Sequence, residues 1–183
     1  MVRRREAGLL LGGLVVAIAA SGVGGYLDWH AHQADERSGR AATLCGLPTG
    51  HDTPLGRLLP AGGQQLEDYG AVRAPDSVSR SCTIRVDGRT ALVISAGQHD
   101  GEPTLPTSAA QQSGTQSFGV GTLSAAWARG AAVADYCLVS NGHVELEVTA
   151  GEAARTAQPD GGRADFEAIA AAVLPEQKNG VCG

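Results

Sequence analysis

An uncharged run of 21 residues near the amino terminus divides this chain into two unlike parts. The run covers residues 7–27 and is bracketed by Glu6 and Asp28. A helix of about 20 apolar residues is long enough to cross the hydrocarbon core of a bilayer. We therefore expect residues 7–27 to form a transmembrane helix that acts as a signal anchor.

The residues on either side of this run predict its orientation. Three consecutive arginines at residues 3–5 precede it, and Tyr26 and Trp29 stand at its far end. Basic residues favour the cytoplasmic side, and aromatic rings settle at the lipid–water boundary. We expect residues 1–6 to be a cytoplasmic tail of a single-pass cell-membrane protein, with everything after the span extracytoplasmic.

A cleaved signal peptide is the alternative. The stretch Ala17-Ile18-Ala19 resembles a small-x-small cleavage site after a short apolar region. The run continues past this point and ends at an aromatic pair, which favours the anchor. Cleavage would make the protein secreted, and either interpretation leaves the following domain outside the cytoplasm.

Gly8 and Gly12 have the small-xxx-small spacing that allows two spanning helices to approach closely. The spacing is compatible with a weak homodimer through the span. Glycines scattered by chance through a chain with 26 of them would look the same.

The remainder reads as a polar stalk over residues 28–44 and a domain over residues 45–183. From residue 41 onward there are nine Arg or Lys and fifteen Asp or Glu, a net charge of −6. An acidic domain repels nucleic acid and anionic lipid headgroups, so neither is an expected partner.

Four cysteines, all of them after the predicted span, suggest disulfide bonds: Cys45, Cys82, Cys137 and Cys182. An even number of cysteines in an exported domain favours disulfides, and no CxxC spacing indicates metal or redox chemistry. Three pairings are possible. We favour Cys45–Cys82 and Cys137–Cys182, because each then closes a loop within one half of the domain.

The clearest local pattern is SCTIRVDGRTALVISAG, residues 81–97. Asp87-Gly88 suits a type I′ turn between two strands. The return strand is continuously apolar, which predicts a central strand covered on both faces. A looser copy, YCLVSNGHVELEVTAG at residues 136–151, raises the possibility of an internal duplication.

Other segments complete an expected α+β domain, in which an antiparallel sheet packs against one or two helices. A short helix is expected at residues 54–59, with a further helical turn at residues 64–69. Residues 97–114 read as a long exposed loop. Two strands are expected at residues 117–127 and 131–139.

An amphipathic helix is expected over residues 165–174, ended by Pro175. Its apolar positions follow helical spacing. The buried stripe is predicted to contain Phe166, Ile169, Ala170 and Val173.

Strict alternation places His143, Glu145 and Glu147 on one face of a predicted strand. Such a face can supply metal ligands, but a polar strand face is more often simply solvated. The adjacent pairs His51-Asp52 and His99-Asp100 have no nucleophile beside them in the sequence. Neither a nucleophile elbow nor a phosphate-binding loop is present, so we assign no catalytic, cofactor-binding or metal residue.

Three features of the chain are shared with one class of envelope protein: the opening MVRRREAGLLLGGLVVAIAA, the Ala/Gly/Arg-rich composition and the four cysteines. In these respects the chain resembles uncharacterised small exported or single-anchor envelope proteins of GC-rich actinobacteria. The resemblance implies an envelope protein and implies no activity.

These features predict a membrane-anchored extracytoplasmic binding or protein-interaction module that needs no cofactor. One alternative is a metal-assisted hydrolase that uses His143 and Glu145 with a loop histidine. Another is a structural accessory subunit that joins a membrane complex through its spanning helix.

Overall fold

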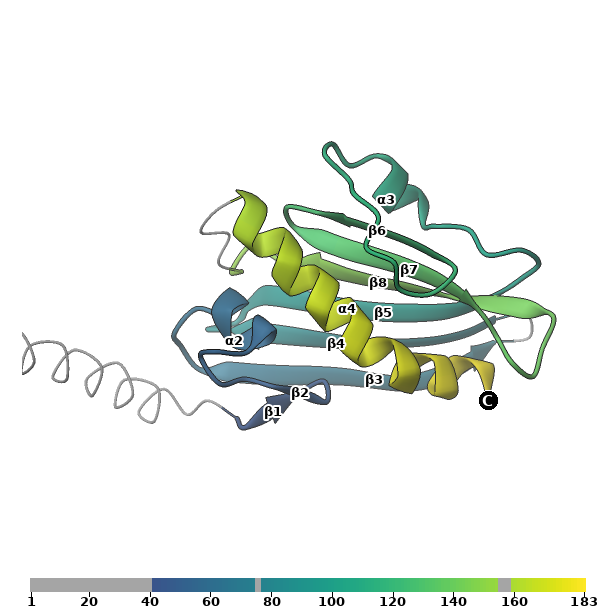
Figure 1. Ribbon diagram of the computed structural model, residues 1–183. Helices are drawn as coiled ribbons and strands as arrows, with labels where there is room; N and C mark the ends of the chain where they lie inside the picture. Colours follow the sequence, from purple (N-terminus) through teal and green to yellow (C-terminus); the bar gives the residue numbers. More distant parts are fainter. Residues whose placement is uncertain (1–40, 75–76, 155–158) are drawn as a thin grey trace, which may run out of the picture. The chain divides into compact units, whose positions relative to one another are not determined.

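The computed structural model describes residues 41–74, 77–154 and 159–183, which form an antiparallel sheet with helices (Figure 1). The predicted α+β class is confirmed. The elements in chain order are β1 Thr43–Leu44, β2 Leu47–Pro48, α2 Pro54–Leu58, β3 Gln64–Ala74, β4 Ser77–Val86, β5 Arg89–Asp100, α3 Thr107–Ala110, β6 Leu123–Trp127, β7 Gly130–Tyr136, β8 Gly142–Ala150 and α4 Pro159–Cys182.

The main sheet has six strands in the order β3-β4-β5-β8-β7-β6, and every neighbouring pair is antiparallel. It therefore consists of two three-stranded meanders that meet at β5 and β8. The two similar stretches end in these two strands. Cys82 lies inside β4, whereas Cys137 follows the end of β7. The cysteines thus occupy different places in their hairpins, and an internal duplication stays a prediction.

The predicted turn between β4 and β5 is confirmed. Asp87 and Gly88 have φ values of 50° and 75°, the positive values that both central residues of a type I′ turn require. The Asp87 carboxylate also accepts a hydrogen bond of 2.8 Å from the backbone N–H of Gly63. The turn is thereby tied to the start of β3.

The return strand β5 is central, as predicted, but only one of its faces is fully covered. Leu92, Ile94 and Ala96 are buried, while the alternate residues Val93 and Ser95 are half-buried. The expectation that both faces are covered was wrong. A continuous apolar run shows that a strand is central without showing how many layers cover it.

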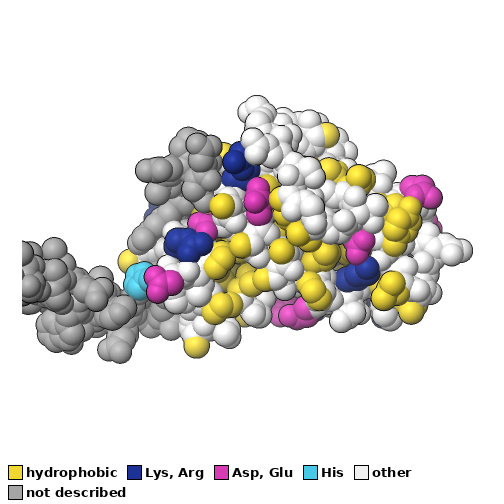
Figure 2. All heavy atoms as spheres, viewed as in Figure 1, with side chains coloured by type: hydrophobic (Ala, Val, Ile, Leu, Met, Phe, Trp, Pro, Cys, Tyr) yellow, Lys and Arg dark blue, Asp and Glu magenta, His cyan; other side chains and the backbone are white. Residues whose placement is uncertain are grey.

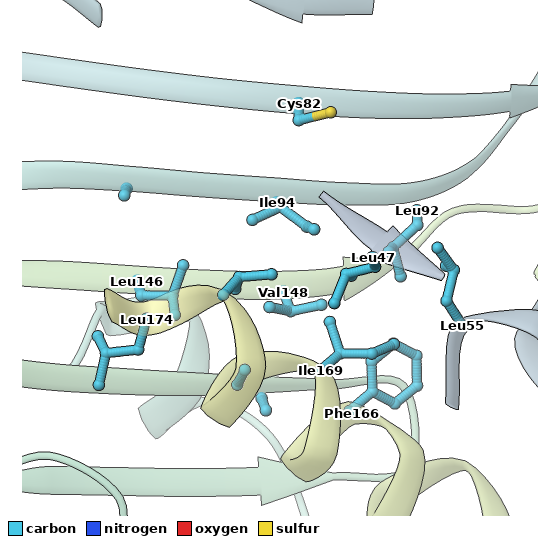
Figure 3. Packing of buried hydrophobic residues seen from close by; sticks show 14 of the residues in the cluster. Leu47, Leu55, Cys82, Leu92, Ile94, Leu146, Val148, Phe166, Ile169 and Leu174 are labelled. Atoms are coloured by element: carbon cyan, nitrogen blue, oxygen red, sulfur yellow. The ribbon is translucent and has the colours of Figure 1, made fainter. Parts of the chain in front are cut away.

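The core lies between the sheet and α4, which crosses one face of the strands (Figure 1). The predicted stripe of α4 is confirmed: Phe166, Ile169, Ala170 and Val173 are all buried. Figure 3 shows Phe166 and Ile169 in the same apolar cluster as Val148 of β8. Each fully buried side chain of this size contributes about 1.5–3 kcal/mol to the free energy of unfolding.

The helix does not end at Pro175, as the sequence suggested, but continues to Cys182. A proline inside a helix removes one hydrogen bond and costs about 3 kcal/mol. Burial of Val181, together with the disulfide at Cys182, opposes that cost. Tertiary contacts beyond Pro175 therefore outweigh the local preference for a break.

Strand pairing corrects other local expectations. Residues 64–69 lie in β3 rather than in a helical turn, because β3 pairs with β4 along its length. The predicted loop at residues 97–114 is shorter, since pairing with β8 extends β5 to Asp100 and α3 follows.

Two further strand boundaries differ. The strand predicted at residues 117–127 begins only at Leu123, after Gly119 and Gly121 with φ values of 70° and 65°. These left-handed conformations are incompatible with a regular strand. The strand predicted at residues 131–139 ends at Tyr136. The helix expected at residues 54–59 is confirmed as α2.

Both favoured disulfides are present. Cys45–Cys82 has a Cα–Cα distance of 6.0 Å and joins the β1–β2 turn to β4. Cys137–Cys182 has a Cα–Cα distance of 5.5 Å and joins the loop after β7 to the end of α4. The predicted cytoplasmic tail, the span at residues 7–27 with Gly8 and Gly12, and most of the stalk lie outside the described residues. Within the described ranges, no helix has the length and apolar character needed to cross a membrane.

Replacing Pro175 by alanine should raise the free energy of unfolding by up to about 3 kcal/mol, because the helix regains an amide donor. The Pro175 side chain is exposed, so little packing is lost. Urea denaturation of the full chain measures the change. The exposed Ala172→Gly variant is the control and should lower it by about 1 kcal/mol. A P175A protein less stable than wild type would contradict this account of the helix.

Candidate functional site

A polar cluster lies on the face of β8 that points away from α4, beneath residues 101–111, which we call the strap. His143 is only 2 % exposed. Its Nδ1 lies 3.2 Å from the carbonyl oxygen of Gly101 in the strap, and its Nε2 lies 3.2 Å from Glu145 Oε1. The imidazole thus joins the strap to the sheet.

Two further side chains of the strap are bonded to β8. The hydroxyl of Thr104 donates a 2.8 Å hydrogen bond to Glu145 Oε1. The hydroxyl of Ser108, on α3, donates a 2.6 Å hydrogen bond to Glu147 Oε1. The carboxylates that alternate along β8 therefore hold the strap in place.

His99 stands beside this cluster on β5. It lies directly opposite His143 in the strand register, and the two rings stack with centroids 5.7 Å apart. Its Nε2 is 3.9 Å from Glu145 Oε2. A Cβ atom at Gly97 would lie 3.0 Å from this nitrogen, so the absent side chain leaves room for the ring.

The structure brings together part of the ligand set that the alternation suggested. His143, Glu145 and Glu147 share one face of β8, as predicted, and His99 joins them from β5. Both His143 nitrogens and Glu147 are already engaged in hydrogen bonds. In the part of the chain that the structure describes, no group of three or more His, Cys, Asp or Glu is arranged to hold a metal ion. The geometry fits attachment of the strap better than metal-assisted hydrolysis.

The other histidine pair lies elsewhere. His51 and Asp52 occupy the exposed turn between β2 and α2. Asp100 ends β5, paired with Gly142. The two pairs therefore lie in different parts of the fold.

A second candidate site is the loop between β7 and β8, which carries two strongly exposed aliphatic side chains. Leu138 is 90 % exposed and Val139 is 78 % exposed. We call these two residues the apolar tip. Other hydrophobic side chains on the face that carries α4 are interspersed with charged ones (Figure 2). Together they form a small exposed apolar patch at the end of a loop, which we take as a candidate contact surface.

The apolar tip stands on a rigid base. The Cys137–Cys182 disulfide precedes it directly, and together with the end of α4 it borders a small pocket of about 140 Å³. The pocket is lined by Leu138, Val139, Lys178, Asn179, Cys182 and Gly183. This site was not predicted, because the expected strand ran through Val139 up to the turn at Ser140-Asn141-Gly142, whereas β7 ends at Tyr136.

An ion pair beside the tip fastens α4 to β7. Lys178 Nζ lies 2.6 Å from Asp135 Oδ2, and Thr122 donates a hydrogen bond to Oδ1. Burial by itself would raise the pKa of the Asp135 carboxyl. The hydrogen bonds from Lys178 and Thr122 outweigh burial and hold that pKa below its usual range.

Comparisons of the chain with protein-family models, with curated proteins and with solved structures found no match. The resemblance to actinobacterial envelope proteins therefore stays a prediction.

Replacing Lys178 by methionine should lower the free energy of unfolding by about 1–2 kcal/mol at pH 7, because Asp135 loses its cation. Because the folded-state pKa of Asp135 is lowered, its stabilising contribution is present above the ordinary carboxyl pKa and is lost as pH falls through the lowered value. The difference between variant and wild type should therefore shrink below about pH 4. Urea denaturation across this pH range measures it.

The control for this variant is Arg163→Met, which removes a 3.6 Å pair with Glu167 along the surface of α4. Such pairs contribute about 0.2–0.5 kcal/mol. Equal destabilisation by K178M at pH 3 and pH 7 would contradict the role assigned to Asp135.

Proposed function

We propose that this chain is a membrane-anchored interaction module whose domain works on the outer side of the cytoplasmic membrane. The observation that carries this is the pair of disulfides, Cys45–Cys82 and Cys137–Cys182, which use every cysteine of the chain. Disulfides persist in oxidising compartments and are rare in the cytosol. The basic residues 3–5 and the uncharged run at residues 7–27 support the same topology.

The apolar tip is the contact that we assign to this module. Ala41, where the described chain begins, donates a hydrogen bond to Gln64 at the start of β3. Gln64 pairs with Val86, at the end of the sheet where β5 begins. The tip instead lies just before Gly142 in the chain, and Gly142 pairs with Asp100 at the other end of β5.

The strand β5 has 12 residues, which span roughly 40 Å. The tip is therefore about that far along the sheet from Ala41. We assign it to a partner protein of the envelope with an apolar cleft for Leu138 and Val139, because such a cleft would bury both exposed aliphatic side chains. The acidic charge of the domain also disfavours anionic lipid.

The topology is tested by adding protease to spheroplasts of a bacterial host that produces the full chain. The domain should be digested while a cytoplasmic marker protein survives, and its cysteines should react with maleimide only after reduction. Protection of the domain, or free thiols before reduction, would contradict an extracytoplasmic location.

The contact is tested with a photo-crosslinking residue at position 138 of the full chain in membranes. A discrete cross-linked product should form, and Val139→Asp should abolish it. Val72→Asp is the matched control, because Val72 is also an exposed valine, 59 % accessible, but lies on β3. Equal loss of the product in both variants would argue against the tip.

Exchange of residues 7–27 for an unrelated spanning helix separates this function from that of a structural accessory. A module that binds through its domain keeps the cross-linked product. Loss of the product would instead favour an accessory subunit that acts through its span.

A further inference from the structure

The chain contains two asparagines, Asn141 and Asn179, and a glycine follows each of them. Asparagine is among the labile side chains of proteins. Its amide carbon can be attacked by the backbone nitrogen of the next residue, and a glycine leaves that approach open because it has no Cβ atom. Both asparagine side chains are exposed to water. Sequence and exposure are therefore alike at the two sites, and only the backbone distinguishes them.

The backbone at Asn179 prevents this attack. Asn179 lies near the end of α4, which continues to Cys182. In an α-helix the N–H of Gly180 is bonded to the carbonyl oxygen four residues earlier, and the Asn179 side chain leans toward the start of the helix, away from that nitrogen. The end of the helix would have to open before a reaction could occur, and the disulfide of Cys182 opposes such opening.

The backbone at Asn141 lacks this protection. Asn141 lies outside any helix or strand, directly before the first residue of β8. The carbonyl oxygen of Gly142 accepts a 3.0 Å hydrogen bond from the N–H of Cys137. The N–H and C=O of one residue in an antiparallel strand face the same neighbour, so the Gly142 N–H also faces Cys137. In the described part of the chain no hydrogen bond runs from this N–H to the Cys137 carbonyl oxygen, so the hairpin does not hold the nitrogen that has to react.

We propose that Asn141 is a site of spontaneous conversion to aspartate and isoaspartate, and that Asn179 is spared. The Gly142 nitrogen loses its proton to water and bonds to Cγ of Asn141, while the Cγ–Nδ2 bond breaks and Nδ2 leaves as ammonia. The product is a five-membered succinimide, which then takes up water. Cleavage of the bond from the Gly142 nitrogen to Cγ gives aspartate, and cleavage of its bond to the backbone carbonyl carbon gives isoaspartate. Nothing is oxidised or reduced, and water is the only co-reactant.

The conversion changes the loop that carries the apolar tip. Either product puts a carboxylate in place of a neutral amide two residues after Val139. Isoaspartate also adds a methylene group to the backbone just before Gly142, which pairs with Asp100. A charge so close to the tip opposes its entry into an apolar cleft. This last consequence rests on the proposed function, whereas the conversion itself does not.

The conversion is tested by incubating the full chain, purified in mild detergent, at pH 8 and mapping its peptides by mass spectrometry after reduction. The peptide with Asn141 should gain the mass difference between OH and NH₂ and separate into two chromatographic forms, aspartate and isoaspartate. It should convert at least about tenfold faster than the peptide with Asn179, because Asn179 reacts only from the small population in which the end of α4 is open.

Two controls isolate the effect of the backbone. In urea, with the disulfides reduced, the two asparagines should convert at comparable rates, because the helix is lost and each is followed by glycine. In the Asn141→Gln variant the peptide should stay unchanged, because the longer side chain would have to close a six-membered ring. Comparable rates at the two sites of the folded chain would overturn the proposal. So would an Asn141 that reacts only in urea.

The consequence for the tip is measured separately, with the photo-crosslinking residue at position 138. Asn141→Asp should reduce the cross-linked product, whereas Gln65→Glu, which adds a carboxylate at an exposed position of β3, should leave it unchanged. Equal product in N141D and wild type would contradict an effect on the tip. Absence of any product in the wild type would contradict the proposed function, while the mass measurement still decides the conversion.

Discussion

Burial of one face of α4 against the six-stranded sheet is the interaction on which the rest of the domain depends. The chain has few aromatic residues, and among the described residues Phe166 is the largest of the fully buried side chains. Around it the core is built from Leu, Ile, Val and Ala. These residues bury little area each, so the helix has to be long and continuous to cover the sheet. That requirement explains why α4 passes through Pro175 without ending.

The polar contacts of α4 lie around its buried apolar face. Near its start, Arg57 of α2 donates a 3.0 Å hydrogen bond from Nε to the buried Asp165. Asp165 raises the pKa of the Arg57 guanidinium through this bond. Lys178 and the disulfide of Cys182 fix the other end. The helix is therefore held at both ends, and the apolar tip is built on its fixed carboxyl-terminal end.

Local sequence patterns predicted the features of the fold that depend only on neighbouring residues. The turn at Asp87-Gly88, the alternation of β8 and the spacing of the α4 stripe all follow from backbone geometry that neighbouring residues impose. The disulfide pairing was also predictable, because each bridge closes a loop within one half of the domain. The identity of β3 was not, since pairing with β4 rather than its own composition makes it a strand.

The candidate sites could likewise be predicted only in part. The shared face of His143, Glu145 and Glu147 could be predicted from a period of two. The carbonyl of Gly101 above His143 could not, because it depends on how a distant segment folds back over the sheet. The apolar tip was hidden for a related reason: Leu138 and Val139 have strand-forming side chains, but β7 ends at Tyr136, directly before the cysteine that bonds to α4.

The most direct test of this account is native-state hydrogen exchange on the full chain. If the packing of α4 against the sheet holds the domain together, amides of α4 on both sides of Pro175 should exchange only with global unfolding. They should give the same opening free energy as the central strands β5 and β8. Exchange of α4 at a markedly lower opening free energy, with β5 and β8 still protected, would contradict the central role of this helix.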